Sequence, residues 1–279
     1  MTLAAIMVSV DFDQASKARI SLAAGLAVRF KSLLIGVAGW PLLKRDRENA
    51  SETELSVEWV SKELESLGEK FRKIAGDITD RVEWRSSMNF PREVIAIEAR
   101  AADLVVIGQG LLPGDIYHTY DPGTIILAAG RPVLVVPQQT DRLEASRVLI
   151  AWKDTREARR AVRDSLPFLK EAKEVNIAVA KTPSSEATDM QIADVAQYLT
   201  RHHVSVGQQI STVAREDEEA VLLELAKEHR VDLIVAGAYG RTRLSEWIFG
   251  GVTRHLLLNS PIPCLFSNCD GGLYSCSMD

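Results

Sequence analysis

The chain has few cysteines and no arrangement of them that is typical of a zinc site. Its three cysteines, Cys264, Cys269 and Cys276, form no C-x-x-C pair, and no histidine lies in their immediate neighbourhood. They also supply no even disulfide set. The sequence therefore predicts a protein without a metal site that functions in a reducing cytoplasm.

Long hydrophobic runs and an excess of basic residues are absent as well. The start MTLAAIMVSVDFD has no basic region before its apolar run, and that run is too short to span a bilayer. The formal net charge is −5, whereas proteins that bind nucleic acids normally present a basic face. We therefore expect neither a membrane nor a nucleic acid among the partners.

Known catalytic motifs are missing too. The sequence contains no G-x-S-x-G nucleophile elbow, no G-x4-G-K-[ST] phosphate loop and no HIGH-type signature of nucleotidyltransferases. Its histidines and aspartates have simpler interpretations as capping, turn or surface residues. We therefore expect no catalytic residues and a protein that is not an enzyme.

The two halves of the chain repeat one pattern of apolar runs and amphipathic segments. The runs AAIMVSV and SRVLIAW each lead into a helical pattern, and SLLIGVAG (32–39) and EVNIAVAK (174–181) follow them. Each half later carries a closely similar run, ADLVVIGQG (102–110) and VDLIVAGAYG (231–240), and closes with a helix and a Pro-led strand. Short apolar strands alternating with helices indicate parallel sheets covered on both faces.

These repeats predict an α/β protein of two tandem Rossmann-like domains, each a five-stranded parallel sheet flanked by helices. We place the boundary near residue 143, which gives domains 1–143 and 144–279. In such sheets a ligand binds at the carboxyl ends of the strands, where the strand order reverses. In the second half, the loops expected there are AWKDT (151–155) and GAYGRTRLSEWIFGGVT (237–253).

The tandem layout and the loop 237–253 resemble the universal stress protein family, whose nucleotide-binding members carry G-x2-G-x9-G-[ST]. Gly237, Gly240 and Gly250 match that spacing, with nine residues between the second and third glycines. The resemblance covers nearly the whole chain and implies the adenine nucleotide alpha hydrolase-like fold. It also implies that ATP or another adenine nucleotide, with or without magnesium, binds in the second domain.

One departure from the family pattern lies after the third glycine. The expected Ser or Thr is Gly251, so a hydroxyl contact to phosphate is missing, although the backbone N–H groups of Gly250 and Gly251 remain. Thr253 follows two residues later and either faces the site or caps the helix. The loss of one neutral hydrogen bond costs about 0.5–1.5 kcal/mol and weakens binding about tenfold at most.

A second departure lies at the end of the first strand of this half. The family commonly has an Asp there that helps to hold the nucleoside, and this chain has Lys153. Asp154 either takes over that role or caps the following helix, and Lys153 either reaches a phosphate or is a solvated surface charge. We include Val179, near the end of the second strand, among the binding residues, and we expect Trp152 to be a packing residue.

The first half has the opposite pattern. It keeps Asp11 at the end of its first strand, but the glycines of GQGLLPGDIYHTYDPG (108–123) do not fit the phosphate spacing. Asp115 and Asp121 would place negative charge where a phosphate should bind. We therefore expect no ATP in this half, while a different ligand stays open. For Trp84 and Arg85, packing and surface charge are preferred to lining a cleft.

The preferred interpretation is a cytoplasmic stress-response protein that acts as an adenine nucleotide-responsive binding or signalling module. Family members pair domains through their last strands, so RPVLVVP and IPCLFS are expected to pair within the chain and make it a pseudo-dimer. A further homodimer stays open, and so does the identity of the protein partners. The alternatives are a nucleotide-independent interaction protein, whose glycine loop is only structural, and a weak ATP hydrolase.

Overall fold

A computed structural model describes residues 2–13, 15–42, 50–109, 120–181, 186–213, 218–239 and 251–269. The strands of the first half are β1 (Ala5–Ser9), β2 (Leu33–Gly39), β3 (Val82–Ser87), β4 (Leu104–Gly108) and β5 (Val133–Val136). Those of the second half are β6 (Arg147–Trp152), β7 (Glu174–Lys181), β8 (Val206–Val213), β9 (Leu233–Gly237) and β10 (Cys264–Ser267).

Helices join consecutive strands in both halves. In the first half they are α1 (Ala15–Phe30), α2 (Ala50–Ala75), α3 (Pro91–Glu98) and α4 (Pro122–Ala128), with short 3-10 turns at Gly76–Arg81 and Ala99–Ala101. In the second half they are α5 (Arg156–Asp164), α6 (Leu166–Leu169), α7 (Glu186–Arg201), α8 (Glu218–Glu228) and α9 (Gly251–Asn259). The predicted β-α repeat is thereby confirmed for both halves.

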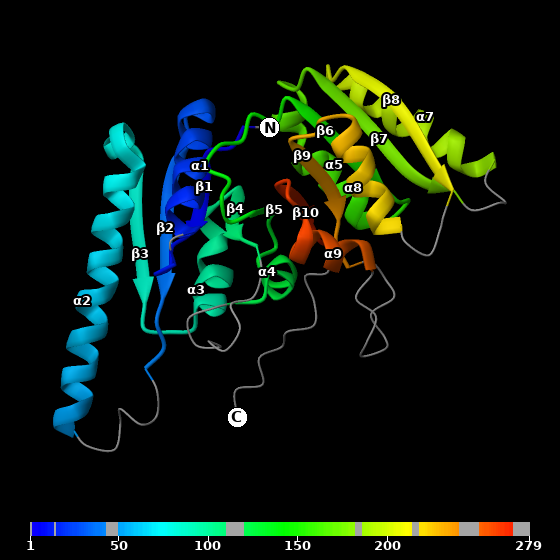
Figure 1. The fold of residues 1–279 in the computed structure, drawn as a ribbon. Helices are drawn as coiled ribbons and strands as arrows, with labels where there is room; N and C mark the ends of the chain where they lie inside the picture. Colours follow the sequence, from blue (N-terminus) through cyan, green and yellow to red (C-terminus); the bar gives the residue numbers. More distant parts are fainter. Residues whose placement is uncertain are drawn as a thin grey trace.

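The described strands form one ten-stranded sheet rather than two separate ones. Its order is β3-β2-β1-β4-β5-β10-β9-β6-β7-β8, so each half has the same internal order and the two halves meet at their last strands (Figure 1). Pairing is parallel within each half and antiparallel between β5 and β10, where Leu134 lies opposite Leu265. The predicted pairing of the last strands within one chain is confirmed.

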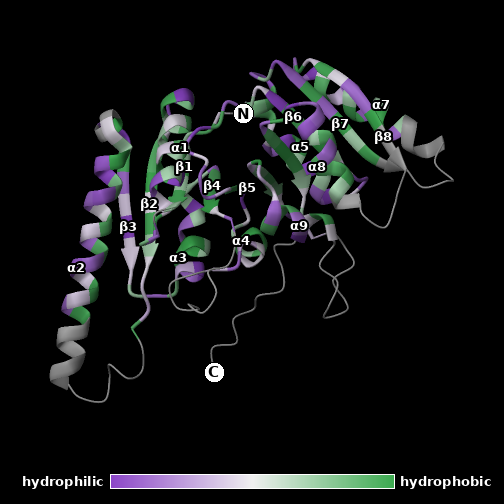
Figure 2. Cartoon of the chain, viewed as in Figure 1, coloured by the Kyte–Doolittle hydropathy of each residue, from purple (hydrophilic) through white to green (hydrophobic). Residues whose placement is uncertain are grey.

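Both faces of the sheet are covered, which explains the continuous apolar strands. Strands such as β4, β5 and β10 are almost entirely buried because helices pack against each face. The part of the long helix α2 that is coloured in Figure 2 carries both hydrophobic and hydrophilic residues. It buries Leu64, Leu67 and Phe71 at helical spacing against the sheet.

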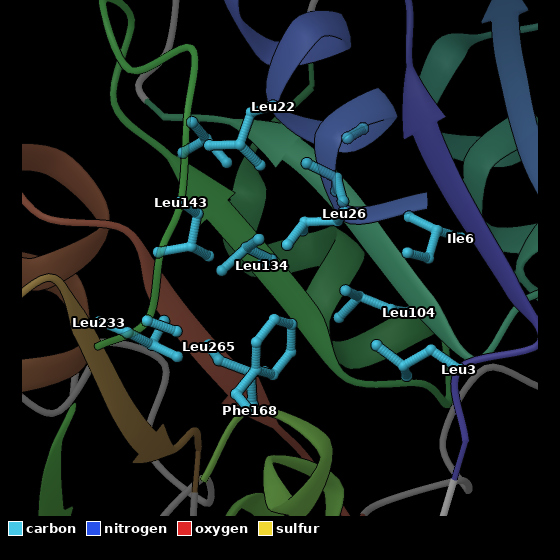
Figure 3. Close-up of a cluster of buried hydrophobic side chains, with 14 of the residues drawn as sticks. Leu3, Ile6, Leu22, Leu26, Leu104, Leu134, Leu143, Phe168, Leu233 and Leu265 are labelled. Carbon is cyan, nitrogen blue, oxygen red and sulfur yellow. The ribbon is translucent and has the colours of Figure 1, made fainter. Parts of the chain in front are cut away.

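The two halves share a core where they meet. Leu22 and Leu26 of α1, Leu134 and Leu265 of the paired strands, and Phe168 of α6 gather in one apolar cluster (Figure 3). The rings of Phe30 and Phe168 meet edge to face with their centroids 5.3 Å apart. At the rim, Arg29 of α1 pairs with Glu171 of the second half at 2.6 Å. The junction therefore holds the halves together by burial as well as by strand pairing.

Two local details differ from a simple repeat. The helical pattern after β6 is divided into α5 and α6, because Pro167 has no amide hydrogen to continue the helix. In β3, Trp84 packs against Phe71 with ring centroids 5.7 Å apart, and Arg85 pairs with Glu83 and Glu98. The packing and surface-charge interpretation of Trp84 and Arg85 is confirmed.

Candidate functional site

The candidate site of the second half lies at the carboxyl ends of β6 and β9, which are neighbouring parallel strands. Ala151 of β6 is in register with Ala236 of β9, so the residues that follow both strands emerge at the same edge of the sheet. Lys153 and Asp154 lie there as exposed residues directly after β6. Gly237 ends β9 beside them. The topology thus brings together the two loops that the sequence selected.

Gly237 is required for close packing at this edge. A Cβ atom on it would overlap the backbone nitrogen of Ala158 and the backbone carbon of Glu157 in the first turn of α5. The last residue of β9 therefore approaches the α5 backbone at a distance that only glycine allows. This packing role explains the first glycine of the loop without reference to any ligand.

The α5 helix is capped by Thr155 and not by Asp154. The Thr155 hydroxyl accepts a hydrogen bond from the Ala158 N–H at 3.2 Å, the usual arrangement for an N-cap residue. Asp154 instead accepts a hydrogen bond from Arg159 at 2.5 Å on the exposed side. The capping alternative for Asp154 is therefore wrong, and its carboxylate is held by an arginine.

Trp152 and Val179 lie side by side at the ends of β6 and β7. They are in register with each other, and both side chains are buried in the core on the α5 face. The packing role predicted for Trp152 is confirmed, although its indole Nε1 has no hydrogen-bond partner among the described residues. The Val179 side chain likewise belongs to the core, and its role in ligand binding stays a prediction.

Sequence reasoning missed Glu157. Its side chain is buried beneath the site, 2% exposed, and its Oε1 atom accepts no hydrogen bond among the described residues, while Arg156 lies 3.6 Å away. The surrounding segment 153–164 carries five basic and three acidic residues, so positive charge predominates around this carboxylate. The sequence shows only that Glu157 is an acidic residue in the first turn of a helix. Such a residue usually interacts with the helix dipole from the surface, so its burial was not expected.

The glycine loop is only partly within the described residues. Gly240 and Gly250 lie outside them, so their predicted roles stay predictions. Gly251 is the first residue of α9, and Thr253 is its third. The capping alternative for Thr253 is wrong, because an N-cap residue precedes the first helical turn and Thr253 lies inside it. Since α9 runs antiparallel to the strands it joins, its first turn and N–H groups lie at the carboxyl edge.

The equivalent place in the first half is filled by its own side chains. Arg19, which is 5% exposed, donates to the Ser9 carbonyl at 2.9 Å and pairs with Asp11 at 2.5 Å. Tyr120 contacts the Ser9 hydroxyl at 2.7 Å and accepts from the Gly108 N–H at 3.0 Å. Desolvation raises the pKa of Tyr120 above its ordinary value, so its hydroxyl keeps its proton. Asp11 is thus engaged by Arg19.

Asp121 occupies the amino end of α4 in this half. Its carboxylate accepts hydrogen bonds from the N–H groups of Gly123 and Thr124 at 3.2 and 3.1 Å. A negative side chain therefore sits where the phosphate of a nucleotide would approach α4. This contact supports the argument against phosphate in the first half, whereas Asp115 lies outside the described residues.

A shallow pocket opens at the carboxyl edge of the first half. Its lining includes Ser9, Asp11, Phe12, Val37, Ala38 and Tyr120. Apolar side chains supply most of its lining, and its polar side chains already have partners: Ser9 bonds to Tyr120, and Asp11 pairs with Arg19. The pocket is thus distinct from the glycine-loop site of the second half.

Metal-binding and membrane-spanning features were sought in the same residues. The described part of the chain contains no cluster of three or more His, Cys, Asp or Glu side chains placed to hold a metal ion. Within that part, none of the helices combines the length and apolar character of a membrane-spanning segment. Cys264 is 1% exposed within β10 and is therefore a core residue.

Comparison with known proteins finds one matching family and several similar structures. Residues 144–267 match the sequence model of the universal stress protein family. The whole fold is similar to a universal stress protein from Archaeoglobus fulgidus DSM 4304, with a TM-score of 0.65, 16% identity and 95% of each chain covered. It is also similar to a functionally unknown protein from Pseudomonas aeruginosa PAO1, with a TM-score of 0.61, 18% identity, and 96% of this chain and 93% of that chain covered. The chain matches none of the curated protein sequences with which it was compared.

The fold defines a protein of two Rossmann-like α/β domains joined through their last strands. Residues 144–267 in its second half match the universal stress protein family, and the whole chain has the fold of a universal stress protein. The family resemblance inferred from the glycine spacing and the repeat is confirmed.

Proposed function

We propose that the protein is a cytoplasmic stress-response module that binds an adenine nucleotide, ATP or AMP, in its second half and responds to it. The observation that carries the proposal is the position of the glycine loop. It leaves the carboxyl end of β9 at Gly237 and leads into the first turn of α9 at Gly251, beside the exposed Lys153. Glycines and a helix amino end are the groups that bind phosphate through backbone N–H donors.

In this proposal, backbone N–H groups at Gly250 and Gly251 hold the phosphates, and Lys153 adds a point charge. Thr253, half-buried in the first turn of α9, supplies a hydroxyl in place of the one absent at Gly251. Asp154 and Val179 lie at the nucleoside end. Binding changes signalling by favouring one arrangement of the loop, which requires a difference in affinity between two states.

Calorimetry with ATP, ADP and AMP, with and without magnesium, tests the proposal. We expect binding below millimolar concentration, and we expect Lys153→Met to weaken ATP more than AMP because the lost charge faces phosphate. Lys170→Met is the matched control, since Lys170 is exposed after α6 at the opposite edge. Absence of binding by all three nucleotides, with no nucleotide retained on gentle purification, would reject the assignment.

One observation favours a nucleotide-independent interaction protein as the second candidate. Gly237 is explained by its packing against α5, and a buried carboxylate, Glu157, lies beneath the same edge. Under this alternative the glycine loop is structural, and none of the nucleotides binds. A weak ATP hydrolase is separated from both by measuring phosphate release that is lost in Gly240→Val.

A further inference from the structure

Three aromatic side chains lie in a row beside the pocket of the first half. Phe12, which follows β1, lines the pocket and is 43% exposed. Its ring meets that of Trp40 edge to face with the centroids 4.7 Å apart, and Trp40 meets Trp59 of α2 in the same way at 5.0 Å. Trp59 is itself 51% exposed. Phe12, Trp40 and Trp59 therefore form an aromatic row whose two outer members are open to solvent.

The pocket wall beside Phe12 is apolar. Side chains from β2, α2 and α3 supply it, namely Val37, Ala38, Leu67, Pro91 and Ile95. Pockets that bind small molecules typically combine walls of this kind with a few polar groups. Aromatic rings add a preferred edge-to-face or offset contact to the burial of apolar area. The lining is therefore suited to an apolar, ring-shaped group.

The charges at this pocket disfavour an anion. Asp11 is the charged residue of its lining, and the described lining includes no lysine or arginine. The carboxylate of Asp121 lies nearby at the amino end of α4, where it already accepts the first amides. A negative ligand would thus meet carboxylates without a free cation. A positive ligand gains little either, because Arg19 already neutralises Asp11.

The second half has the opposite chemistry at the equivalent positions. The strand registers place Asp154 and Lys181 of the second half where the first half has Phe12 and Trp40. Both pairs lie three residues beyond equivalent register pairs, Ser9 with Val37 and Ala151 with Ala178. The shared fold therefore does not require aromatic residues there. Their presence in the first half is specific to that half.

We propose that the pocket and the aromatic row beside it form a ligand site of the first half, which binds a small uncharged molecule with an aromatic ring. The ligand ring packs against Phe12 and covers the apolar wall around Ile95 and Leu67. This site is separate from the nucleotide site proposed for the second half. The two proposals therefore succeed or fail independently.

A pair of fluorescent probes tests the class of ligand. N-phenyl-1-naphthylamine is uncharged and aromatic, and 1-anilinonaphthalene-8-sulfonate has the same rings with an added sulfonate. We expect the uncharged probe to bind at a single site per chain and the sulfonate to bind about tenfold more weakly or worse, because Asp11 and Asp121 repel it. Equal binding of the two probes would overturn the uncharged class, and absence of binding by the neutral probe would overturn the site.

Substitution of Phe12 tests the position of the site. Phe12→Ser removes the ring at an exposed position, and we expect the affinity for the uncharged probe to fall about tenfold. Phe12→Trp keeps an aromatic wall and should stay within about threefold of the wild type. Met190→Ser is the matched control, because it removes an apolar side chain that is 72% exposed on α7, in the other half. Equal affinity in Phe12→Ser and the wild type would contradict the proposal.

Hydrogen exchange and competition locate the bound probe independently of any substitution. All measurements use full-length chains that circular dichroism shows to be folded. We expect the uncharged probe to slow exchange of the amides at 9–12 and 37–40 but not at 151–154, and an excess of ATP to leave its affinity unchanged. Protection at 151–154 alone, or displacement of the probe by ATP, would overturn the proposal. If ATP does not bind at all, the proposed function fails, while the probe affinities and the exchange rates still decide whether the first half has this site.

Discussion

At the scale of single residues, the glycines that end the equivalent strands β4 and β9 have different neighbours in the two halves. Gly237 brings β9 against the backbone of α5, whereas Gly108 makes room for the guanidinium of Arg19. The buried Arg19 is neutralised by Asp11, so the first half contains an internal ion pair after β1. At the equivalent place after β6, the second half has the exposed Lys153.

Gly237→Ala should destabilise the protein by about 1–3 kcal/mol, because its methyl group would overlap the α5 backbone, which cannot move as a side chain can. Urea unfolding gives the free energy. Gly25→Ala should instead stabilise by about 0.5–1 kcal/mol, since the helix gains propensity and no atom is displaced. Equal effects at the two positions would contradict the packing role of Gly237.

Cys264 should resist alkylation in the folded protein. Burial raises the pKa of its thiol to about 12, so at pH 8 only about one molecule in ten thousand carries the reactive thiolate. Burial also raises the pKa of the Cys269 thiol, with the nearby Glu157 adding to the effect, but Cys269 is only partly buried and should react faster. Peptide mass spectrometry after iodoacetamide treatment measures both sites. Rapid labelling of native Cys264 at pH 8 would be evidence against its placement in β10.

At the scale of elements, the amino ends of equivalent helices differ between the halves. The α4 helix begins with Asp121 as its N-cap and Pro122 in its first turn, so its first amides are satisfied within the chain. The α9 helix begins instead at Gly251, directly after the glycine loop. The amino end of α4 is therefore capped by its own side chain, whereas the equivalent end of α9 follows glycines.

Asp121→Ala should cost about 1 kcal/mol of stability, since the Gly123 and Thr124 amides lose their acceptor. Asp121→Asn keeps an acceptor oxygen and should stay close to the wild type. Urea denaturation of both variants measures the difference. A similar loss in the two variants would mean that the charge of Asp121, and not its capping oxygen, provides the stabilisation.

At the scale of the whole molecule, the antiparallel pair of β5 and β10 makes one sheet from two domains. The pairing of last strands that the family resemblance implied is made within this chain. The shared core of Leu134, Leu265 and Phe168 would be exposed if the halves were separated. The proposed boundary near residue 143 therefore divides the sequence into two halves that remain in contact through a shared sheet and a shared core.

Residues 144–279 produced alone should form a homodimer, because the free edge of β10 can pair with a second copy and rebury its apolar face. Residues 1–143 should self-associate for the same reason, and mixing the two fragments should give a one-to-one complex. Light scattering after size-exclusion chromatography measures the masses. Stable monomers of both fragments would show that the junction contributes little.

Much of this architecture follows from the sequence because its signals are local. The apolar runs around Val105 and Ile234 predict buried parallel strands. The helical spacing of Leu55, Trp59, Leu64, Leu67 and Phe71 predicts the face that α2 buries; the last three are buried, whereas Trp59 is 51% exposed and Leu55 lies outside the described side chains. The contacts of individual residues at the candidate site are harder to predict from the sequence. The role of Thr155 as N-cap in place of Asp154 depends on a single turn, and both residues are favoured at that position.

The sequence by itself determined the tandem repeat, the parallel strands within each half and the place of the glycine loop in the chain, because periodicity and glycine spacing are properties of neighbouring residues. The order of the strands came from the structure. The tertiary structure decided that Arg19 and Tyr120 occupy the carboxyl edge of the first half, that Glu157 is buried at that of the second, and that Gln109 bonds to the carboxyl end of α9. Those contacts join residues far apart in the chain, for example Gln109 and Ser260. Their distances are set by packing across the sheet, which no local pattern in the sequence encodes.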